Sequence, residues 1–376
     1  MKSKISFIHK AETHEKLATR DIAMADREDT DDDMDEDDSQ EEEGTEEEEE
    51  ENWEEEDEEG EEIEIVNDDD DDDDSENSDG DSFLEEAVPT PEEVDLEYTY
   101  PHDFVGRRSW EEVVAAGQYF RLILDPSCTE IERAYFSDCY FLIELIFRGT
   151  KLTRIRQRAF YSCINLQRIT NGLPMGLVEL EGDAFFNCGS LQQETLTIPR
   201  TVRTIGADCF NFCICITRVV FEHHLPTDTI TLHPSVFTNC KELQSVTLPS
   251  TLSYIPICCF SGCRSLTNIP IPTAVRVIHR WAFYFCSALR TVDLAENITT
   301  IHKEAYVGCT SLEMVTIQST TVHFAERPFD RCPALRIVNI YPWVWPRLLE
   351  AMRYDCTFCY TFVRQYHYQL ERFRQR

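Results

Sequence analysis

The residue pair with the greatest chemical potential is Cys356-x-x-Cys359, a spacing found in zinc sites and in redox-active disulfides. A structural zinc site needs two further ligands, so one such pair is weak support for a metal. Both sulfurs also fall on an apolar seam of the C-terminal segment. We therefore predict that this pair packs, and we predict neither a metal site nor redox chemistry.

Nine other cysteines, from Cys139 to Cys332, each follow an aromatic residue by three positions. If they stack on successive turns of a repeat, their Cα atoms lie about 4.8 Å apart, within the range of disulfides. Parallel side chains keep the Cβ atoms nearly as far apart, however, whereas a disulfide prefers about 3.8 Å. We predict free thiols that pack as small apolar groups.

A calcium-binding loop of the EF-hand type is nearly matched from Ser75 to Glu86. The first ligand should be Asp but is Ser75, and no amphipathic helices flank the loop. We predict no specific calcium site here.

Motifs of common catalytic sites are missing from the sequence: a Gly-rich phosphate loop, His-Glu-x-x-His and Gly-x-Ser-x-Gly. His223 and His224 are adjacent, and adjacent side chains rarely converge on one atom. We predict a protein without enzymatic activity or cofactor. An enzyme whose site is assembled from loops without a motif remains an alternative.

The elements that carry the cysteines form an internal repeat. An aromatic residue, a cysteine three positions later and an aliphatic residue three positions after that recur nine times. The aromatic residues are Phe136, Phe160, Phe185, Phe210, Phe237, Phe260, Phe283, Tyr306 and Phe329. Such a period is typical of solenoid proteins, in which stacked turns bury a continuous column.

Two further positions keep the phase of the repeat. Five residues before each aromatic lies an apolar residue, such as Ile155 or Ile278. After the aliphatic residue come alternating apolar pairs, which predict a strand with one buried face. These pairs include Val246/Leu248, Ile269/Ile271, Val292/Leu294, Val315/Ile317 and Val338/Ile340. Each unit is thus one strand plus a short helical or turn segment.

The repeat resembles BspA-type leucine-rich repeats, as in Val275, Ile278, Ala282, Phe283, Cys286 and Leu289. This resemblance implies an α/β, leucine-rich-repeat-like, right-handed solenoid of about nine turns. In that family it also implies roles in adhesion or protein interaction, often in secreted or surface proteins.

The two ends of the solenoid are expected to carry helical caps, with the repeats and the first cap at residues 107–341. Ser109 and Glu112 form a capping box before a helix at residues 110–116. Residues 342–376 are predicted to form a helix beginning near Pro346, with a heptad seam from Leu349 to Phe373. Two interpretations stay open for this helix: a cap seated through Trp343 and Trp345, or a helix that pairs in a homodimer or with a helical partner.

The acidic charge of the chain is confined to one segment. Residues 28–106 hold 44 Asp or Glu and no Lys or Arg, against a net charge of −38 for the whole chain. Such a segment cannot offset the entropy of ordering its backbone, so residues 1–98 are predicted to be a disordered tail. Its negative charge argues against direct binding of nucleic acid. The tail also suggests an alternative function, a chaperone for basic proteins such as histones, similar to that of acidic leucine-rich nuclear phosphoproteins.

The location is predicted to be cytoplasmic or nuclear. The first 27 residues lack the apolar core of a secretory signal, and no run of 18 apolar residues could cross a membrane. The 16 cysteines then lie in a reducing compartment.

The predicted function is that of a scaffold that binds a protein or peptide on the outward face of the solenoid strands. The expected contact residues are Arg168, Arg218, Ser245, Thr247, Asn268, Thr291, Asp293, Thr316 and Asn339. Their mixed, Thr-rich character fits a protein surface better than a nucleic-acid backbone.

Overall fold

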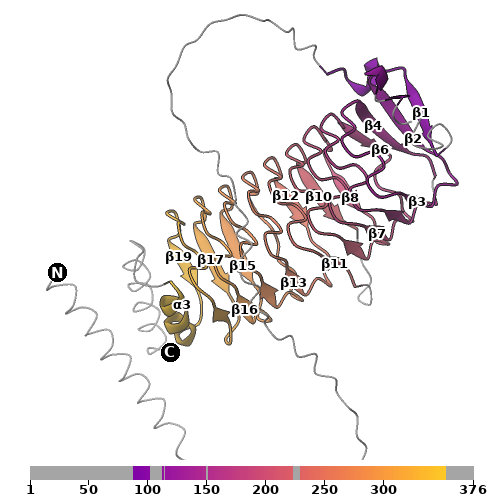
Figure 1. Ribbon diagram of the computed structural model, residues 1–376. Helices are drawn as coiled ribbons and strands as arrows, with labels where there is room; N and C mark the ends of the chain where they lie inside the picture. The colour runs from indigo at the N-terminus through magenta and orange to yellow at the C-terminus, as the bar shows by residue number, and fades with distance from the viewer. Residues whose placement is uncertain (1–87, 102–111, 114, 150, 223–228, 353–376) are drawn as a thin grey trace, which may run out of the picture. The chain divides into compact units, whose positions relative to one another are not determined.

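The computed structural model describes residues 88–101, 112–113, 115–149, 151–222 and 229–352. The chain divides into two compact units, residues 1–81 and 82–376, and all described residues belong to the second. In this unit the chain winds into a solenoid whose strands are all parallel (Figure 1). The predicted leucine-rich-repeat-like solenoid is confirmed.

One side of the solenoid, here called the long-strand face, consists of three sheets with the orders β1-β2-β4-β6, β8-β10-β12 and β15-β17-β19. Its strands are β1 (Glu97–Tyr100), β2 (Phe120–Leu124), β4 (Leu142–Phe147), β6 (Arg168–Thr170), β8 (Leu196–Ile198), β10 (Arg218–Phe221), β12 (Ser245–Thr247), β15 (Thr291–Leu294), β17 (Met314–Ile317) and β19 (Ile337–Asn339).

The opposite side, the short-strand face, consists of two sheets with the orders β3-β5-β7-β9-β11 and β13-β14-β16-β18. Its two-residue strands are β3 (Glu130–Ile131), β5 (Arg154–Ile155), β7 (Glu179–Leu180), β9 (Thr204–Ile205), β11 (Thr231–Leu232), β13 (Tyr254–Ile255), β14 (Val277–Ile278), β16 (Thr300–Ile301) and β18 (His323–Phe324). Each strand ends on the apolar residue found five positions before an aromatic. The repeat therefore contains two strands, where one had been expected.

Turns, not helices, connect a short strand to the following long strand. In all nine repeats the residues two positions before and two after the aromatic have positive φ, for example Asp183 and Asn187 at 58° and 56°. This backbone directs the N–H groups of Asp183, Phe185 and Asn187 at carbonyls of the next turn, over 2.8–2.9 Å. The turns are thereby hydrogen-bonded to one another between the two faces. The helical part of the expected α/β repeat is absent from the nine turns described here.

The aromatic residues form one continuous stack inside the solenoid. From Phe136 to Phe329, neighbouring ring centroids lie 4.9–5.8 Å apart with interplanar angles of 3–17°. The column is almost wholly inaccessible to solvent. Its burial makes a large apolar contribution to the stability of the fold.

The cysteines form a second column, and each has a specific partner. From Cys163 to Cys332, each Sγ donates to the backbone carbonyl of the aromatic residue one turn earlier, over 3.1–3.3 Å. The fourteen described cysteines are free thiols. Their role is thus that of a small apolar side chain with a weak donor, which satisfies a carbonyl between turns.

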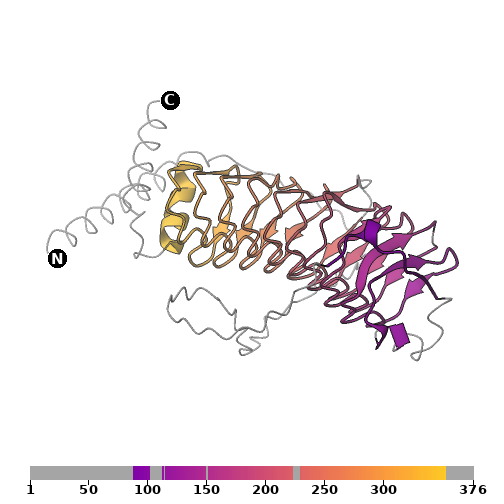
Figure 2. The same ribbon diagram turned by 90° about the horizontal axis from the view of Figure 1, so that it is seen from above.

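The C-terminal end of the solenoid is closed by η2 (Pro342–Val344) and α3 (Trp345–Ala351). Trp345 and Leu348 are buried, and the Arg327 amide donates to the Ala351 carbonyl over 2.9 Å. Figure 2 shows α3 across the end of the turns. Trp343 differs from the expected cap contact: it is 46% exposed and stacks on Tyr341. The remainder of the predicted seam, with Cys356 and Cys359, lies outside the described residues.

The N-terminal end begins earlier than residue 107. Here η1 (Pro91–Glu93) precedes β1, and β1 pairs with β2. Val94 and Tyr100 are buried, while Leu96 and Tyr98 pack on the core, so an alternating strand lies within the acidic sequence. Residues 88–98 are therefore structured rather than part of a disordered tail. Residues 112–113 and 115–116 are helical, but the rest of the expected cap, like residues 1–87, lies outside the described residues.

One expected strand is reduced to a single bridge. Ile269 is buried and Ile271 packs on the core, as the alternation predicts, but only Asn268 pairs, with Ser245. Pro270 and Pro272 lack the N–H groups that a ladder requires. The long-strand face is consequently interrupted between β12 and β15.

Candidate protein-binding face

Two rows of side chains point outward from the long-strand face. The first row follows the register of the strands through Glu97, Arg121, Glu144 and Arg168, then through Arg218, Ser245 and Asn268, and finally through Thr291, Met314 and Ile337. The second row contains Thr99, Ile123, Ile146 and Thr170, then Thr197, Val220 and Thr247, and finally Asp293, Thr316 and Asn339.

The nine predicted contact residues all lie on these rows. Arg168, Arg218, Ser245, Asn268 and Thr291 belong to the first row, and Thr247, Asp293, Thr316 and Asn339 to the second. All are exposed or half-buried. Their role in binding remains a prediction.

The first row begins with four charged side chains of alternating sign. Arg121 pairs with Glu97 over 2.8 Å and approaches Glu144 at 3.9 Å. Arg168 Nε donates to Glu144 Oε1 over 2.9 Å, and the Thr170 hydroxyl also donates to this carboxylate. Glu144 is thus held between two guanidinium groups.

Glu144 is the one charged residue among the buried polar side chains described, with 2% of its surface exposed. A buried carboxylate is tolerated only where cations and hydrogen-bond donors replace water. Arg121, Arg168 and Thr170 provide these groups. In return, the hydrogen bond to Glu144, followed by one to Glu92, raises the pKa of Arg168 above its ordinary value. The position of the Arg168 side chain is therefore fixed by its buried partner.

A cleft of about 740 Å³ opens beside this cluster. Its wall includes three basic residues, Arg121, Arg148 and Arg168, and three acidic residues, Glu97, Glu144 and Glu194. Amides of Asn171, Gln192 and Gln193 complete the polar lining. The Nε–H of Arg121 is buried and has no acceptor among the described residues.

The cleft lies where the sheet is broken between β6 and β8. Two extra residues in this repeat place Gln193 and Glu194 where a strand would otherwise begin. The Gln193 side chain instead accepts a hydrogen bond from the Ile169 amide, over 3.3 Å. The break therefore replaces strand pairing by a side-chain contact and leaves a hollow.

The segment before β1 borders the same cluster. The Pro89 carbonyl accepts a hydrogen bond from the Gln167 side chain over 2.9 Å, and Glu92 pairs with Arg168 over 2.6 Å. Pro91 is buried. β1 and β6 are the two edge strands of the same sheet. We call residues 89–93 the strap, because they directly precede β1 but contact the opposite edge, at β6.

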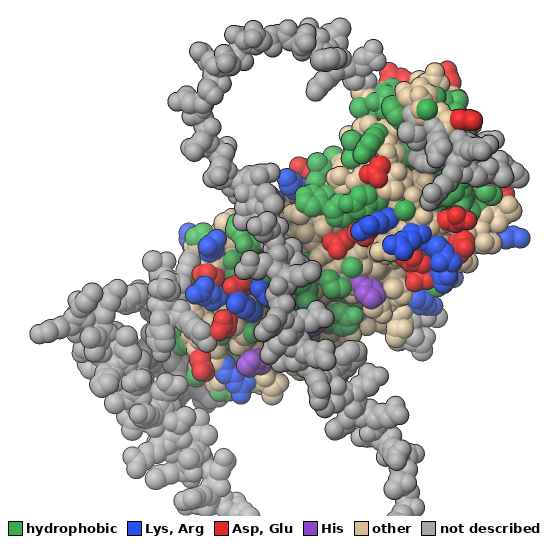
Figure 3. Space-filling model, viewed as in Figure 1, with side chains coloured by type: hydrophobic (Ala, Val, Ile, Leu, Met, Phe, Trp, Pro, Cys, Tyr) green, Lys and Arg blue, Asp and Glu red, His purple; other side chains and the backbone are tan. Residues whose placement is uncertain are grey.

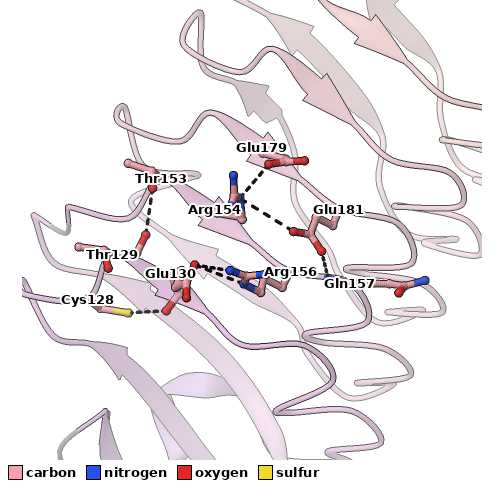
Figure 4. A network of polar contacts seen from close by, with 9 residues as sticks. All are labelled: Cys128, Thr129, Glu130, Thr153, Arg154, Arg156, Gln157, Glu179 and Glu181. Carbon is pink, nitrogen blue, oxygen red and sulfur yellow. Dashed lines mark hydrogen bonds and ion pairs between the residues drawn. The ribbon is translucent and has the colours of Figure 1, made fainter.

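A second charged network covers the short-strand face at β3, β5 and β7 (Figure 4). Arg154 pairs with Glu179 over 2.8 Å, and Arg156 with Glu130 over 2.9 Å. The Glu181 carboxylate accepts a hydrogen bond from the backbone N–H of Gln157. Figure 3 shows basic and acidic side chains mixed over this surface. These pairs link successive turns and satisfy one another, which is typical of a stabilising surface network.

Metal and thiol chemistry receive no support from the geometry. Within the described ranges, His, Cys, Asp and Glu side chains nowhere gather in threes around a possible metal position. His279 and His302 stack at 4.9 Å, and burial, followed by the charge of His302, lowers the pKa of His279. Burial raises the pKa of Cys128 and Cys258 to about 11 and that of Cys139 to about 12. Such thiols are poor nucleophiles at neutral pH.

Every helix in the part of the chain that the structure describes is too short or too polar to span a bilayer.

The sequence interpretation missed Glu97, Arg121 and Glu144. Glu97 lies in the segment predicted to be disordered, and Glu144 is enclosed in the apolar strand Leu142–Phe147. The signal that could have identified Arg121 and Glu144 is a charged residue at a strand position that points outward.

Comparison with known proteins identifies the repeat in the sequence. The sequence pattern described as the BspA-type leucine-rich repeat region matches residues 129–230 and 222–336, in six copies. Among solved structures, a leucine-rich repeat protein from Bacteroides ovatus is 21% identical with a TM-score of 0.48, and the match covers 58% of this chain and 62% of that protein. The leucine-rich repeat protein of T. pallidum is 30% identical with a TM-score of 0.40, over 45% of this chain and 77% of that one. A search among curated proteins found no match.

Proposed function

Because this chain belongs to the BspA-type leucine-rich repeat family, we propose that it is a non-enzymatic scaffold whose long-strand face binds a protein or peptide. Its repeat fold suggests protein interaction in general. The further proposal is that the two outward rows and the cleft between β6 and β8 form the contact surface.

The observation that carries this proposal is the cleft. It combines charged groups of both signs with several amides, which are the groups that pair with a polypeptide backbone and its side chains. The buried Nε–H of Arg121 is a donor that a carbonyl or carboxylate of a ligand would satisfy. The alternating charges of the first row do not form the basic stripe that nucleic-acid backbones require.

The rest of the face supports the same interpretation. Parallel strands hold the outward side chains at a spacing of about 4.8 Å, so a ligand meets a rigid, preorganised surface. Its middle and end combine small polar residues, such as Thr247, Asp293 and Asn339, with a few apolar ones, such as exposed Ile337. Such a surface is suited to direct and water-mediated hydrogen bonds with a protein partner.

We also propose a cytoplasmic or nuclear location, supported by the column of free thiols. Eight of its S–H groups each donate to a carbonyl one turn earlier, and a reducing compartment is the environment in which cysteines remain thiols by default. Imaging of a tagged full-length chain tests this location.

Site-specific photocrosslinking in cells tests the binding face. A photoreactive residue at Thr247, on the long-strand face, should form protein adducts, whereas the same residue at exposed Thr231, on the short-strand face, should not. Arg218→Glu in the same chain should reduce the adducts at Thr247. Equal labelling from both faces, or adducts unaffected by Arg218→Glu, would contradict the proposal.

A further inference from the structure

The strap shows which chemistry the edge of the long-strand face accepts. Gln167 provides an amide donor to a backbone carbonyl, and Arg168, the next residue, provides a guanidinium to a carboxylate. Arg168 begins β6, and Gln167 is the residue before it. A peptide that fits this corner therefore presents a carbonyl and, three residues later, an acidic side chain.

Proline gives the strap its shape. Thr90, between Pro89 and Pro91, is extended at φ −75° and ψ 157°. Its N–H and hydroxyl both donate to the Glu93 carboxylate, over 2.8 and 2.9 Å. Because prolines restrict the unbound chain as well, a segment of this kind loses little entropy on binding.

One group of the receptor half, Arg168, is also held by a residue outside the strap. Arg168 Nε is bound to buried Glu144, which leaves Nη1 directed at Glu92. The carboxylate of Glu92 is 66% exposed, so its attachment is weak compared with that of Glu144. The corner is thus a preformed site, and the contact that Glu92 of the strap makes with it is easily displaced.

We propose that Gln167 and Arg168 form a docking site for an extended, proline-containing acidic peptide, occupied in cis by the strap and accessible to a partner segment of the same chemistry in trans. This inference rests on the proposed function, because it names the ligand chemistry for one edge of the same face. Displacement of the strap would expose the neighbouring cleft to the remainder of the partner.

The probe is a fluorescent peptide with the sequence of residues 87–95, titrated against the full chain and followed by anisotropy. In the Glu92→Lys variant the strap is repelled by Arg168, so the peptide should bind about ten-fold more tightly than to the unmodified chain, in which the tethered strap competes. Glu296→Lys, the same charge change at an exposed position near the other end, is the matched control and should not differ from the unmodified chain.

Removal of the receptor groups completes the test. In the Glu92→Lys background, Gln167→Ala should weaken peptide binding about three-fold and Arg168→Ala further, whereas exposed Arg290→Ala should have no effect. Circular dichroism verifies folding, and if Arg168→Ala unfolds the chain, a peptide with Gln in place of the residue equivalent to Glu92 tests the same contact. Peptide affinity that is equal in all variants, or absent from all, overturns the proposal. The crosslinks at Thr247 would persist in that case if the long-strand face binds proteins by other contacts.

Discussion

The two halves of the solenoid share one core and differ in their surfaces. Between Phe136 and Phe237, successive aromatics are 24–27 residues apart, and this irregular half contains the charged first row, the break at Gln193 and the cleft. From Phe237 to Phe329 the spacing is a constant 23 residues. In this regular half the outward side chains are mostly uncharged, with small polar residues beside Met314 and Ile337. Among the described residues its one ion pair is Lys303–Glu326, at 3.7 Å.

This difference shows how a repeat protein gains a site without changing its core. The aromatic stack and the thiol column pass through both halves with the same geometry. The two extra residues of the repeat that contains Gln193 are accommodated outside the columns, where they interrupt strand pairing and open the surface. The irregular turns therefore carry the features by which one ligand could be selected over another, and the regular turns lengthen the solenoid.

The largest effect is expected from alkaline pH, because it acts on the column shared by both halves. Burial raises the pKa of seven cysteines of this column, and all seven are inaccessible to solvent. Their stabilisation is complete below the unfolded pKa of about 8.5 and is lost as pH rises towards the folded pKa, by about 1.4 kcal/mol per thiol and pH unit. Since a domain is stable by about 5–15 kcal/mol, we expect cooperative unfolding between about pH 9 and 10.

Circular dichroism under reducing conditions measures this transition, and hydrogen exchange resolves the two halves. A chain that remains folded at pH 11, or halves that unfold at clearly separate pH values, would contradict the shared column.

The next effect concerns the aromatic stack. Phe185→Ala in the irregular half and Phe283→Ala in the regular half should each lower the free energy of unfolding by about 3–5 kcal/mol, because both rings are fully buried between two others. Urea denaturation measures both. A loss below about 1 kcal/mol in one half only would show that the core is not equivalent in the two halves.

A smaller effect is expected at the first row and should separate the halves. Glu144→Ala removes the shared partner of Arg121 and Arg168 and should cost about 2 kcal/mol, reduced from the value for fully buried pairs because both arginines are partly exposed. Asp293→Ala, on the same face of the regular half, should change stability by less than about 0.5 kcal/mol. Equal costs at the two positions would remove the distinction.

The smallest effect should be stabilising. Tyr306 takes the place of Phe in the stack, and its hydroxyl is buried without a hydrogen-bond partner among the described residues. Tyr306→Phe removes the cost of this unpaired group and should raise the free energy of unfolding by about 1 kcal/mol. Thermal denaturation measures this change. The matched comparison is Phe283→Tyr, which adds a buried hydroxyl in the neighbouring turn and should lower the denaturation temperature.

Sequence periodicity predicted the interior well, because identical positions in stacked turns have identical surroundings. Phe210, Cys213 and Ile216 are fully buried, as their spacing required. The short-strand face was not predicted as strands, since pairs such as Arg154–Ile155 are too short to show alternation. In these pairs the sequence pattern identified only the apolar residue, such as Ile155, as part of the repeat.

The candidate site was predicted only in part. Arg168 and the polar residues of the regular half follow from alternation along a strand. Glu144 does not, because a carboxylate inside an apolar strand is explained only by partners from neighbouring turns. The break at Gln193 was visible as an irregularity, but the cleft that it opens depends on which backbone groups lose their pairing.

The constant 23-residue period of the last turns makes them units of equal length. Duplication or deletion of one such unit would shift α3 by a single strand spacing, about 4.8 Å, and preserve the register of the aromatic and thiol columns. The number of these repeats can therefore set the length of the solenoid, while the turns of unequal length near its start keep their individual shapes.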